Sequence, residues 1–337
     1  MIWSTALSLV IGLAAFLTLI LTSDPAQILA LLLQTGWGLL LVAALHVPQI
    51  FCSALGWQPL IEDSRRPGLL TLTKLRWVRE SANAMLPFVQ VAGELARAQL
   101  LLRRGVGRIR VVASIAVDLA TEMASQIVFS LMGVAVLLLI PHEGGDTVTH
   151  WLIAATLLGG GLTVAFMLAQ RFGLFRLVEK LLPRFAARAG WASLGDMTGL
   201  NEAVLRLYRQ PSHLWRSGAG HLASWLIGVV ETWAAMWLLG IEASFAEAMV
   251  IESLAQAVRS AGFFIPGALG VQEGGYVLLC GLFGIPADQA LALALVRRLR
   301  DIALGLPGLV AWRLDASGPH LGKPALVGMA KPGMGKH

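Results

Sequence analysis

Long apolar runs constrain this chain more than any other feature. A run of about 18 or more apolar residues can cross a membrane as one helix, since about 20 residues rise about 30 Å. Six runs have this length: Ile2–Leu21, Ile28–Trp57, Val111–Ile140, Val148–Gln170, Leu214–Leu239 and Ala287–Trp312. The sequence therefore predicts an all-α polytopic membrane protein with about six transmembrane helices.

The composition agrees with this fold class. The chain is 56% hydrophobic and 14% charged, whereas a soluble domain carries about a quarter charged residues. This composition excludes a soluble enzyme, a disordered chain and a disulfide-rich secreted scaffold. Cys52 and Cys280 lie inside apolar runs and are expected as buried thiols. The net charge of +6 does not point to nucleic acid, because in a membrane protein the distribution of charge matters more than its sum.

Two further apolar stretches are interrupted near their middle. Leu69–Leu102 is broken at Pro87, and Phe245–Phe283 is broken at Pro266-Gly267. Each half is too short to span the hydrocarbon layer. Irregular backbone is tolerated at membrane depth only where protein or a water-filled cavity surrounds it. We therefore predict two re-entrant helical hairpins.

The basic residues indicate the orientation. Of the 26 Lys and Arg residues, 21 lie either in the polar connector 171–213 or near helix ends that belong to the same side of the membrane as this connector. Four other loops contain neither Lys nor Arg: Thr22–Gln27, Pro141–Thr149, Gly240–Glu247 and Ile285–Gln289. By the positive-inside rule we expect both termini in the cytoplasm. Residues 1–314 form one predicted membrane domain, and 315–337, rich in Gly, Pro and Lys, a predicted disordered cytoplasmic tail.

The two broken stretches are related by an internal repeat with an offset of 179 residues. It relates about 28–140 to about 214–312, and the predicted orientation makes the repeats inverted. Inverted repeats with broken helices place a transporter's site near the bilayer midplane. The matched positions are Glu80 and Arg259, Leu86-Pro87 and Ile265-Pro266, Glu94 and Glu273, Gly105 and Gly284, and Glu122 and Asp301.

Glu94 and Glu273 are the first candidate site residues, because each opens the second half of a hairpin. A helix N-terminus stabilises a carboxylate there, so each can either anchor its hairpin or handle substrate or protons. Arg97 lies one turn after Glu94 and is expected to pair with it. Glu273 has Gln272 beside it and no nearby cation in its own hairpin, which makes it the candidate for a proton-coupled step.

A second group of charges lies on the spans that follow the hairpins. Asp118 and Glu122 are four residues apart on one span, and Arg297 and Asp301 are four apart on the other, beside Arg298. Ionisable groups inside membrane helices are costly and mark functional sites. We expect ion pairs between the two repeats here. A structural network and a site for an anionic lipid headgroup both remain open.

Four other ionisable residues lie within apolar segments. Arg259 and Glu252 share a helix face, and Arg259 completes the candidates for substrate or ion handling. Glu231 is the most isolated acid. His46 can either titrate or be a satisfied polar residue.

Several motifs are absent from the sequence: the phosphate-binding loop, the H-E-x-x-H zinc motif, the G-x-S-x-G nucleophile motif and the C-x-x-C dithiol. The sequence therefore predicts no cofactor, no metal site and no enzymatic activity.

Three segments resemble a known family. They are Arg76–Pro87 (RWVRESANAMLP), Gly93–Leu101 (GELARAQLL) and Phe264–Gly275 (FIPGALGVQEGG). Together they resemble the lysylphosphatidylglycerol synthase transmembrane, or flippase-like, superfamily over nearly the whole chain. Leu45–Pro48 (LHVP) makes the chain most similar to its hopanoid-cluster branch of HpnL-type inner-membrane proteins. The chain departs from many relatives at Gln272, where they have Arg.

The resemblance implies a lipid transporter or flippase of the bacterial cytoplasmic (inner) membrane. It would move an amphipathic lipid between leaflets, either a hopanoid-related lipid or an anionic phospholipid. In larger relatives a separate cytosolic domain makes the lipid, and the resemblance here covers only the membrane module. The alternative is a non-transporting membrane partner that holds a lipid-biosynthesis enzyme at the cytoplasmic face. Membrane lipids are the expected partners under the first interpretation, and such an enzyme under the second.

Overall fold

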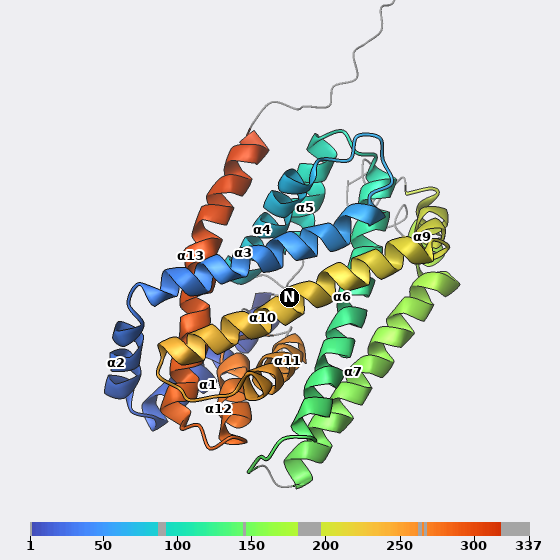
Figure 1. The fold of residues 1–337 in the computed structure, drawn as a ribbon. Helices are drawn as coiled ribbons and strands as arrows, with labels where there is room; N and C mark the ends of the chain where they lie inside the picture. Colours follow the sequence, from blue (N-terminus) through green and yellow to red (C-terminus); the bar gives the residue numbers. More distant parts are fainter. Residues whose placement is uncertain are drawn as a thin grey trace, which may run out of the picture.

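The computed structural model describes residues 2–86, 92–143, 146–180, 197–261, 265 and 268–317. Within these ranges every regular element is a helix, which confirms the predicted all-α polytopic class (Figure 1). The longer helices are α1 (Ile2–Thr22), α2 (Pro25–Thr35), α3 (Gly38–Trp57), α4 (Leu69–Met85), α5 (Ala92–Arg103), α6 (Arg108–Leu137), α7 (Asp146–Phe172), α9 (Leu200–Tyr208), α10 (Pro211–Leu238), α11 (Phe245–Ala261), α12 (Val271–Gly281) and α13 (Ala287–Ser317).

Three helical segments are long and apolar enough to cross a membrane: Gly38–Leu60, Arg108–Leu137 and His150–Phe172. The bent pair of α1 and α2 provides a fourth if it is counted as one span. Helices α10 and α13 have 28 and 31 residues but do not meet the same criterion. Both carry buried charged residues, Glu231 on α10 and Arg297 on α13.

The predicted span Ile28–Trp57 is wrong as a single helix. Its first part belongs to α2, which ends before Gly36, and α3 begins at Gly38. Gly36 has φ +47°, a left-handed conformation that glycine adopts without steric cost and that ends a helix. At the other end of α2, the Asp24 carboxylate accepts hydrogen bonds from the N–H groups of Ala26 and Gln27. This N-cap and Pro25 start a new helix, and α1 and α2 therefore meet at 95°.

The helix boundaries repeat with the offset found in the sequence. Helix α5 begins at residue 92 and α12 at residue 271, which is 179 later, and α6 and α13 begin at 108 and 287 with the same offset. Helices α3 and α10, and α4 and α11, correspond within a few residues. Figure 1 shows that α3 and α10 lie side by side and run in opposite directions. Helices α6 and α13, on opposite flanks of the molecule, also run in opposite directions (Figure 1). The two halves are therefore inverted relative to each other.

Each hairpin packs against the long helix of the other repeat. Helix α4 lies on α13, and α11 lies on α6, while the α4–α5 and α11–α12 hairpins sit at opposite ends of the molecule (Figure 1). Two glycines permit these close contacts. A Cβ at Gly308 of α13 would clash with Ser81 of α4, and a Cβ at Gly133 of α6 would clash with Ser253 of α11. The hairpins therefore connect the two repeats rather than standing apart.

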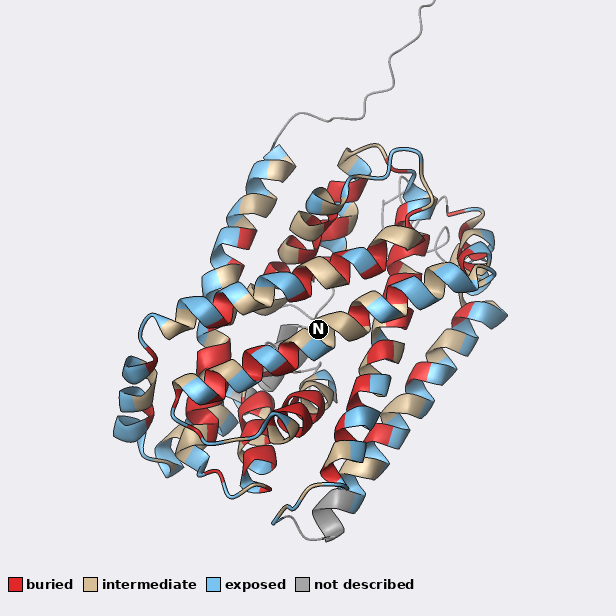
Figure 2. Cartoon of the chain, in the orientation of Figure 1, coloured by how far each residue is buried: buried red, intermediate tan, exposed pale blue. Residues whose placement is uncertain are grey.

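The buried apolar residues form two separate clusters. One is built around Leu75 and Leu100 of the first repeat, and the other around Leu254 and Leu293 of the second. Figure 2 shows the buried positions facing inward, and the outer face of α7 exposes apolar residues such as Leu158. Exposed apolar surface is what a lipid-facing helix requires.

Some predicted features lie outside the described residues. These include the hairpin prolines Pro87 and Pro266 and the chain beyond residue 317. Of the predicted polar connector 171–213, residues 171–180 and 197–213 are described. The predicted disordered tail begins too early, because α13 continues to Ser317.

Candidate functional site

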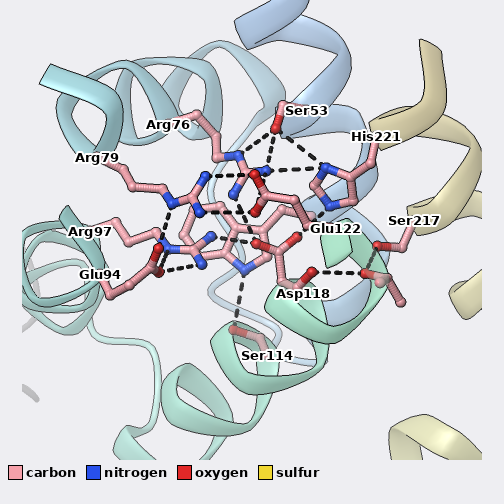
Figure 3. A network of polar contacts seen from close by, with 12 residues as sticks. Ser53, Arg76, Arg79, Glu94, Arg97, Ser114, Asp118, Glu122, Ser217 and His221 are labelled. Atoms are coloured by element: carbon pink, nitrogen blue, oxygen red, sulfur yellow. Dashed lines mark hydrogen bonds and ion pairs between the residues drawn. The ribbon is translucent and has the colours of Figure 1, made fainter. Parts of the chain in front are cut away.

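A first group of charged side chains is buried between α4, α5, α6 and α10 (Figure 3). We call it the first charge cluster, and it consists of Arg76, Arg79, Glu94, Arg97, Asp118, Glu122 and His221. Asp118 lies at its centre with a fully buried side chain. Arg76 Nη1 and Arg97 Nη1 donate to Asp118 Oδ2 at 2.9 and 2.5 Å, and His221 Nε2 lies 2.9 Å from Oδ1. This arrangement offsets the cost of burying two guanidinium groups.

Glu94 occupies the hairpin side of the same cluster. Arg97 Nε donates to Glu94 Oε2 at 2.6 Å, so the expected pair is present. Arg79 Nε donates to Glu94 Oε1 at 2.5 Å, and Arg79 Nη1 donates to Glu122 Oε1 at 2.9 Å. The Arg97 guanidinium also lies over the Trp57 ring, 4.7 Å from its centroid, a favourable cation–π contact. Glu94 therefore fixes the hairpin to α6 through two arginines.

A second charge cluster crosses between the two repeats. It consists of His46, Glu80, Glu231, Glu252, Arg259, Glu273, Arg297, Arg298, Arg300 and Asp301. Arg297 forms a two-pronged pair with Glu252, at 2.7 Å from Nη1 to Oε2 and 2.9 Å from Nη2 to Oε1. Such planar, bidentate geometry is what arginine provides and lysine does not.

Glu231 is not an isolated acid. It accepts hydrogen bonds from Arg300 and Gln49, and His46 Nδ1 lies 3.0 Å from its Oε2. Glu273 also has a cation, because Arg298 on α13 pairs with it. The sequence showed no nearby cation within the hairpin of Glu273, and the partner comes from a different helix, α13.

The expected ion pairs between Asp118 or Glu122 and the arginines of α13 are wrong as well. Asp118 and Glu122 pair with α4 and α5, whereas Arg297 pairs with α11. At the repeat-related positions Asp118 and Arg297 the signs are exchanged: the acid of the first span pairs with hairpin arginines, whereas the arginine of the second span pairs with a hairpin acid. At the other related positions, Glu122 and Asp301, both spans carry an acid that faces a hairpin arginine. Repeat symmetry therefore determines which helices pair, and not which charge each carries.

Four repeat-related charged residues remain partly exposed. Glu80 and its counterpart Arg259 are 33% and 30% exposed, and Glu122 and its counterpart Asp301 are each 17% exposed. They lie near the C-terminal ends of α4 and α11 and in the middle of α6 and α13. Together with Arg298 and His46, these residues are the more exposed part of a largely buried polar region between the repeats.

Several members of this region were not singled out from sequence. Arg76 and Arg79 were counted among the cytoplasmic basic residues, but Arg76 is fully buried and Arg79 is 12% exposed. The available signal in the sequence was that both arginines lie in the same short motif as Glu80, four residues and one residue before it. Ser53 accepts hydrogen bonds from Arg76, and its counterpart Thr232 accepts one from Arg297. No sequence pattern marks either hydroxyl.

A separate hollow of about 630 Å³ lies at the loops between α3 and α4 and between α5 and α6. Asp63 organises it. Burial opposes ionisation of this carboxyl, but hydrogen bonds from the N–H groups of Arg65 and Gly107, together with the Arg110 guanidinium, hold its pKa below the ordinary value. Among the described residues no group of three His, Cys, Asp or Glu side chains is arranged to hold a metal ion.

Together these features define a class: a polytopic α-helical membrane protein with ion pairs buried between two inverted repeats. The chain belongs to the family described as the lysylphosphatidylglycerol synthase TM region, whose model matches residues 5–308. This confirms the family resemblance seen in the sequence; the hopanoid-cluster branch stays a prediction. Comparisons with curated proteins and with solved structures found no match.

Proposed function

We propose that this protein moves an amphipathic lipid between the leaflets of the bacterial cytoplasmic membrane, with both of its termini in the cytoplasm. The observation that carries the proposal is the partly exposed quartet of repeat-related charges, Glu80, Arg259, Glu122 and Asp301, within the contact between two inverted repeats. Inverted repeats with broken helices are the architecture in which a central site opens alternately to the two sides.

The charges of the quartet suit a polar headgroup. Arg259 and the 20% exposed Arg298 offer donors for a phosphate or hydroxyl, while Glu80 and Asp301 offer acceptors. Buried ion pairs elsewhere in the two clusters keep the remaining charges satisfied in a medium where an unpaired charge is costly. A hopanoid-related lipid and an anionic phospholipid both present such a headgroup. The proposed role contains no covalent step.

The test is lipid translocation by the purified protein in proteoliposomes, with a fluorescent phospholipid whose outer-leaflet population is quenched chemically. Wild-type protein should move the labelled lipid faster than protein-free vesicles do. Arg259→Gln should slow this movement, because Arg259 is partly exposed and its ion pair with Asp301 is long, at 3.8 Å, so that the fold is disturbed little. Lys74→Gln, at a 38% exposed surface pair, is the matched control and should leave the rate unchanged.

The alternative role is a membrane partner that positions a lipid-biosynthesis enzyme at the cytoplasmic face. It predicts that the folded, reconstituted wild-type protein moves no labelled lipid of either class, phospholipid or hopanoid. That result would overturn transport and favour the partner role.

A further inference from the structure

His46 lies at the junction between the two repeats. It belongs to α3, and its imidazole stands between a carboxylate of α4 and a carboxylate of α10. His46 Nε2 is 3.1 Å from Glu80 Oε2, and His46 Nδ1 is 3.0 Å from Glu231 Oε2. Glu80 comes from the first repeat and Glu231 from the second, so this one ring joins the two halves of the molecule.

The hydrogen bonds of the ring depend on its protonation. A neutral imidazole donates from one nitrogen and accepts at the other, whereas the protonated ring donates from both. His46 Nδ1 faces both an acceptor, Glu231, and a donor, Arg300 Nη1, at 2.9 Å. With the proton, the ring donates to Glu80 and to Glu231. Without it, the ring donates to Glu80 and accepts from Arg300. Each protonation state therefore has a complete set of partners.

A change at His46 reaches the other hairpin through a continuous series of contacts. Arg300 also pairs with Asp301, at 2.5 Å from Nη2 to Oδ1, and Asp301 lies 3.8 Å from Arg259 of α11. The series thus starts at Glu80 and ends at Arg259, which are repeat-related positions on the two hairpins. Arg300 contacts His46, Glu231 and Asp301 at the same time, so this one guanidinium links the His46 ring to Asp301 and to its contact with α11.

We propose that His46 is the proton-binding site that couples proton movement to lipid movement in this protein. The inference rests on the proposed lipid transport and adds its coupling ion. The proton reaches the ring past Glu80, whose side chain is 33% exposed, while that of His46 is 17% exposed. Gain and loss of this proton make and break the His46–Glu231 contact between the repeats.

The other buried histidine of these clusters is a natural comparison. His221 Nε2 lies 2.9 Å from Asp118 Oδ1, and its Nδ1 faces the Arg76 guanidinium at 3.2 Å. These contacts place His221 in the first charge cluster, outside the series from Glu80 to Arg259, so it is the matched control for His46.

The first experiment needs no transport. Full-length protein labelled with ¹⁵N-histidine is studied by NMR in detergent from about pH 5 to pH 9, with His46→Gln and His221→Gln assigning the two ring signals. The His46 signal should change between the forms with one and two N–H groups. Glu80→Gln, at a partly exposed position, should shift the midpoint of the His46 titration. A His46 signal that keeps one form throughout would overturn the proposal.

The second experiment measures labelled-lipid translocation in proteoliposomes with and without an imposed pH gradient. The wild-type rate should change several-fold with the gradient, and the His46→Gln rate should not, whereas His221→Gln should keep its response. If wild type translocates and His46→Gln responds as strongly, proton coupling at His46 is wrong and lipid transport stands. If wild type translocates under neither condition, the proposed function itself is wrong.

Discussion

Asp118→Asn is the substitution with the largest expected effect on stability. The change keeps the size of the side chain and removes its charge. Asp118 is fully buried and accepts from Arg76 and Arg97, which are fully buried as well. Without the carboxylate, two guanidinium groups remain in the protein interior with fewer anionic partners, and Arg76 then has Glu122 at 3.6 Å as its nearest acid among the described residues.

Breaking a buried ion pair from one side costs about 3–5 kcal/mol, because an uncompensated charge is left behind. At about 2–4 °C per kcal/mol for a chain of roughly this size, the apparent melting temperature should fall by roughly 10 °C. The assay is thermal unfolding of the purified protein in detergent, followed by the fluorescence of its tryptophans.

Asp315→Asn is the matched control. Asp315 also pairs with two cations, Lys74 at 2.7 Å and Arg104 at 2.9 Å, but these side chains are 38% and 19% exposed. Exposed pairs contribute at most about 1 kcal/mol, so the control should lose only a few degrees. Equal losses for Asp118→Asn and Asp315→Asn would refute the reasoning that burial determines the cost.

A double-mutant comparison separates the partners of Asp118. Adding Arg76→Gln to Asp118→Asn should recover part of the lost stability, because the unpaired cation is removed with its acid. Adding Arg297→Gln should recover none, since Arg297 pairs with Glu252 instead. If Arg297→Gln restores stability to Asp118→Asn and Arg76→Gln does not, Asp118 pairs with Arg297 across the repeats.

Three further outcomes are expected in the same unfolding assay. Gly133→Ala should lower the melting temperature, because the added Cβ would clash with Ser253, and Gly133→Ala with Ser253→Gly should regain part of it. Glu273→Gln should lower the melting temperature by several degrees, since Glu273 is buried and pairs with Arg298. Asp63 has a lowered pKa in the folded state, so its contribution is present above its ordinary pKa of about 4 and is lost as the pH falls below it. The difference between wild type and Asp63→Asn should therefore shrink below about pH 4.

The repeat was predictable because its signal is local and rare. Prolines, glutamates and glycines in one frame identified the offset, and the start of α5, α6, α12 and α13 follows it to the residue. The pairing of Glu94 with Arg97 was predictable for the same reason, because both lie on one turn of one helix. Features that depend on neighbouring residues in the chain could be deduced from the sequence.

Pairing between helices was not predictable in this way. Asp118 and Arg297 stand at equivalent positions of the two repeats in the sequence. In the structure, the hairpins pack between the two spans and supply Arg76 and Glu252 as their partners. The break of Ile28–Trp57 at Gly36 was missed because hydropathy stays high on both sides of it and therefore does not mark the end of a helix. The Asp24-Pro25 start signal was available in the sequence.

The central claim is that transport requires the two inverted repeats to move against each other. Gln126 of α6 donates to Ser260 of α11 at 2.7 Å, so the two positions bridge the repeats. In a background without the native cysteines, Gln126→Cys with Ser260→Cys is joined by a short reducible bifunctional thiol reagent. The control pair, Asp63→Cys with Arg110→Cys, lies within the first repeat, where these side chains are 2.8 Å apart.

The measurement is labelled-lipid translocation before cross-linking, after it, and after reduction of the cross-link. The bridge between α6 and α11 should stop translocation, its reduction should restore the rate, and the control bridge should leave the rate unchanged. Translocation at the same rate before and after α6 is joined to α11 would contradict the account.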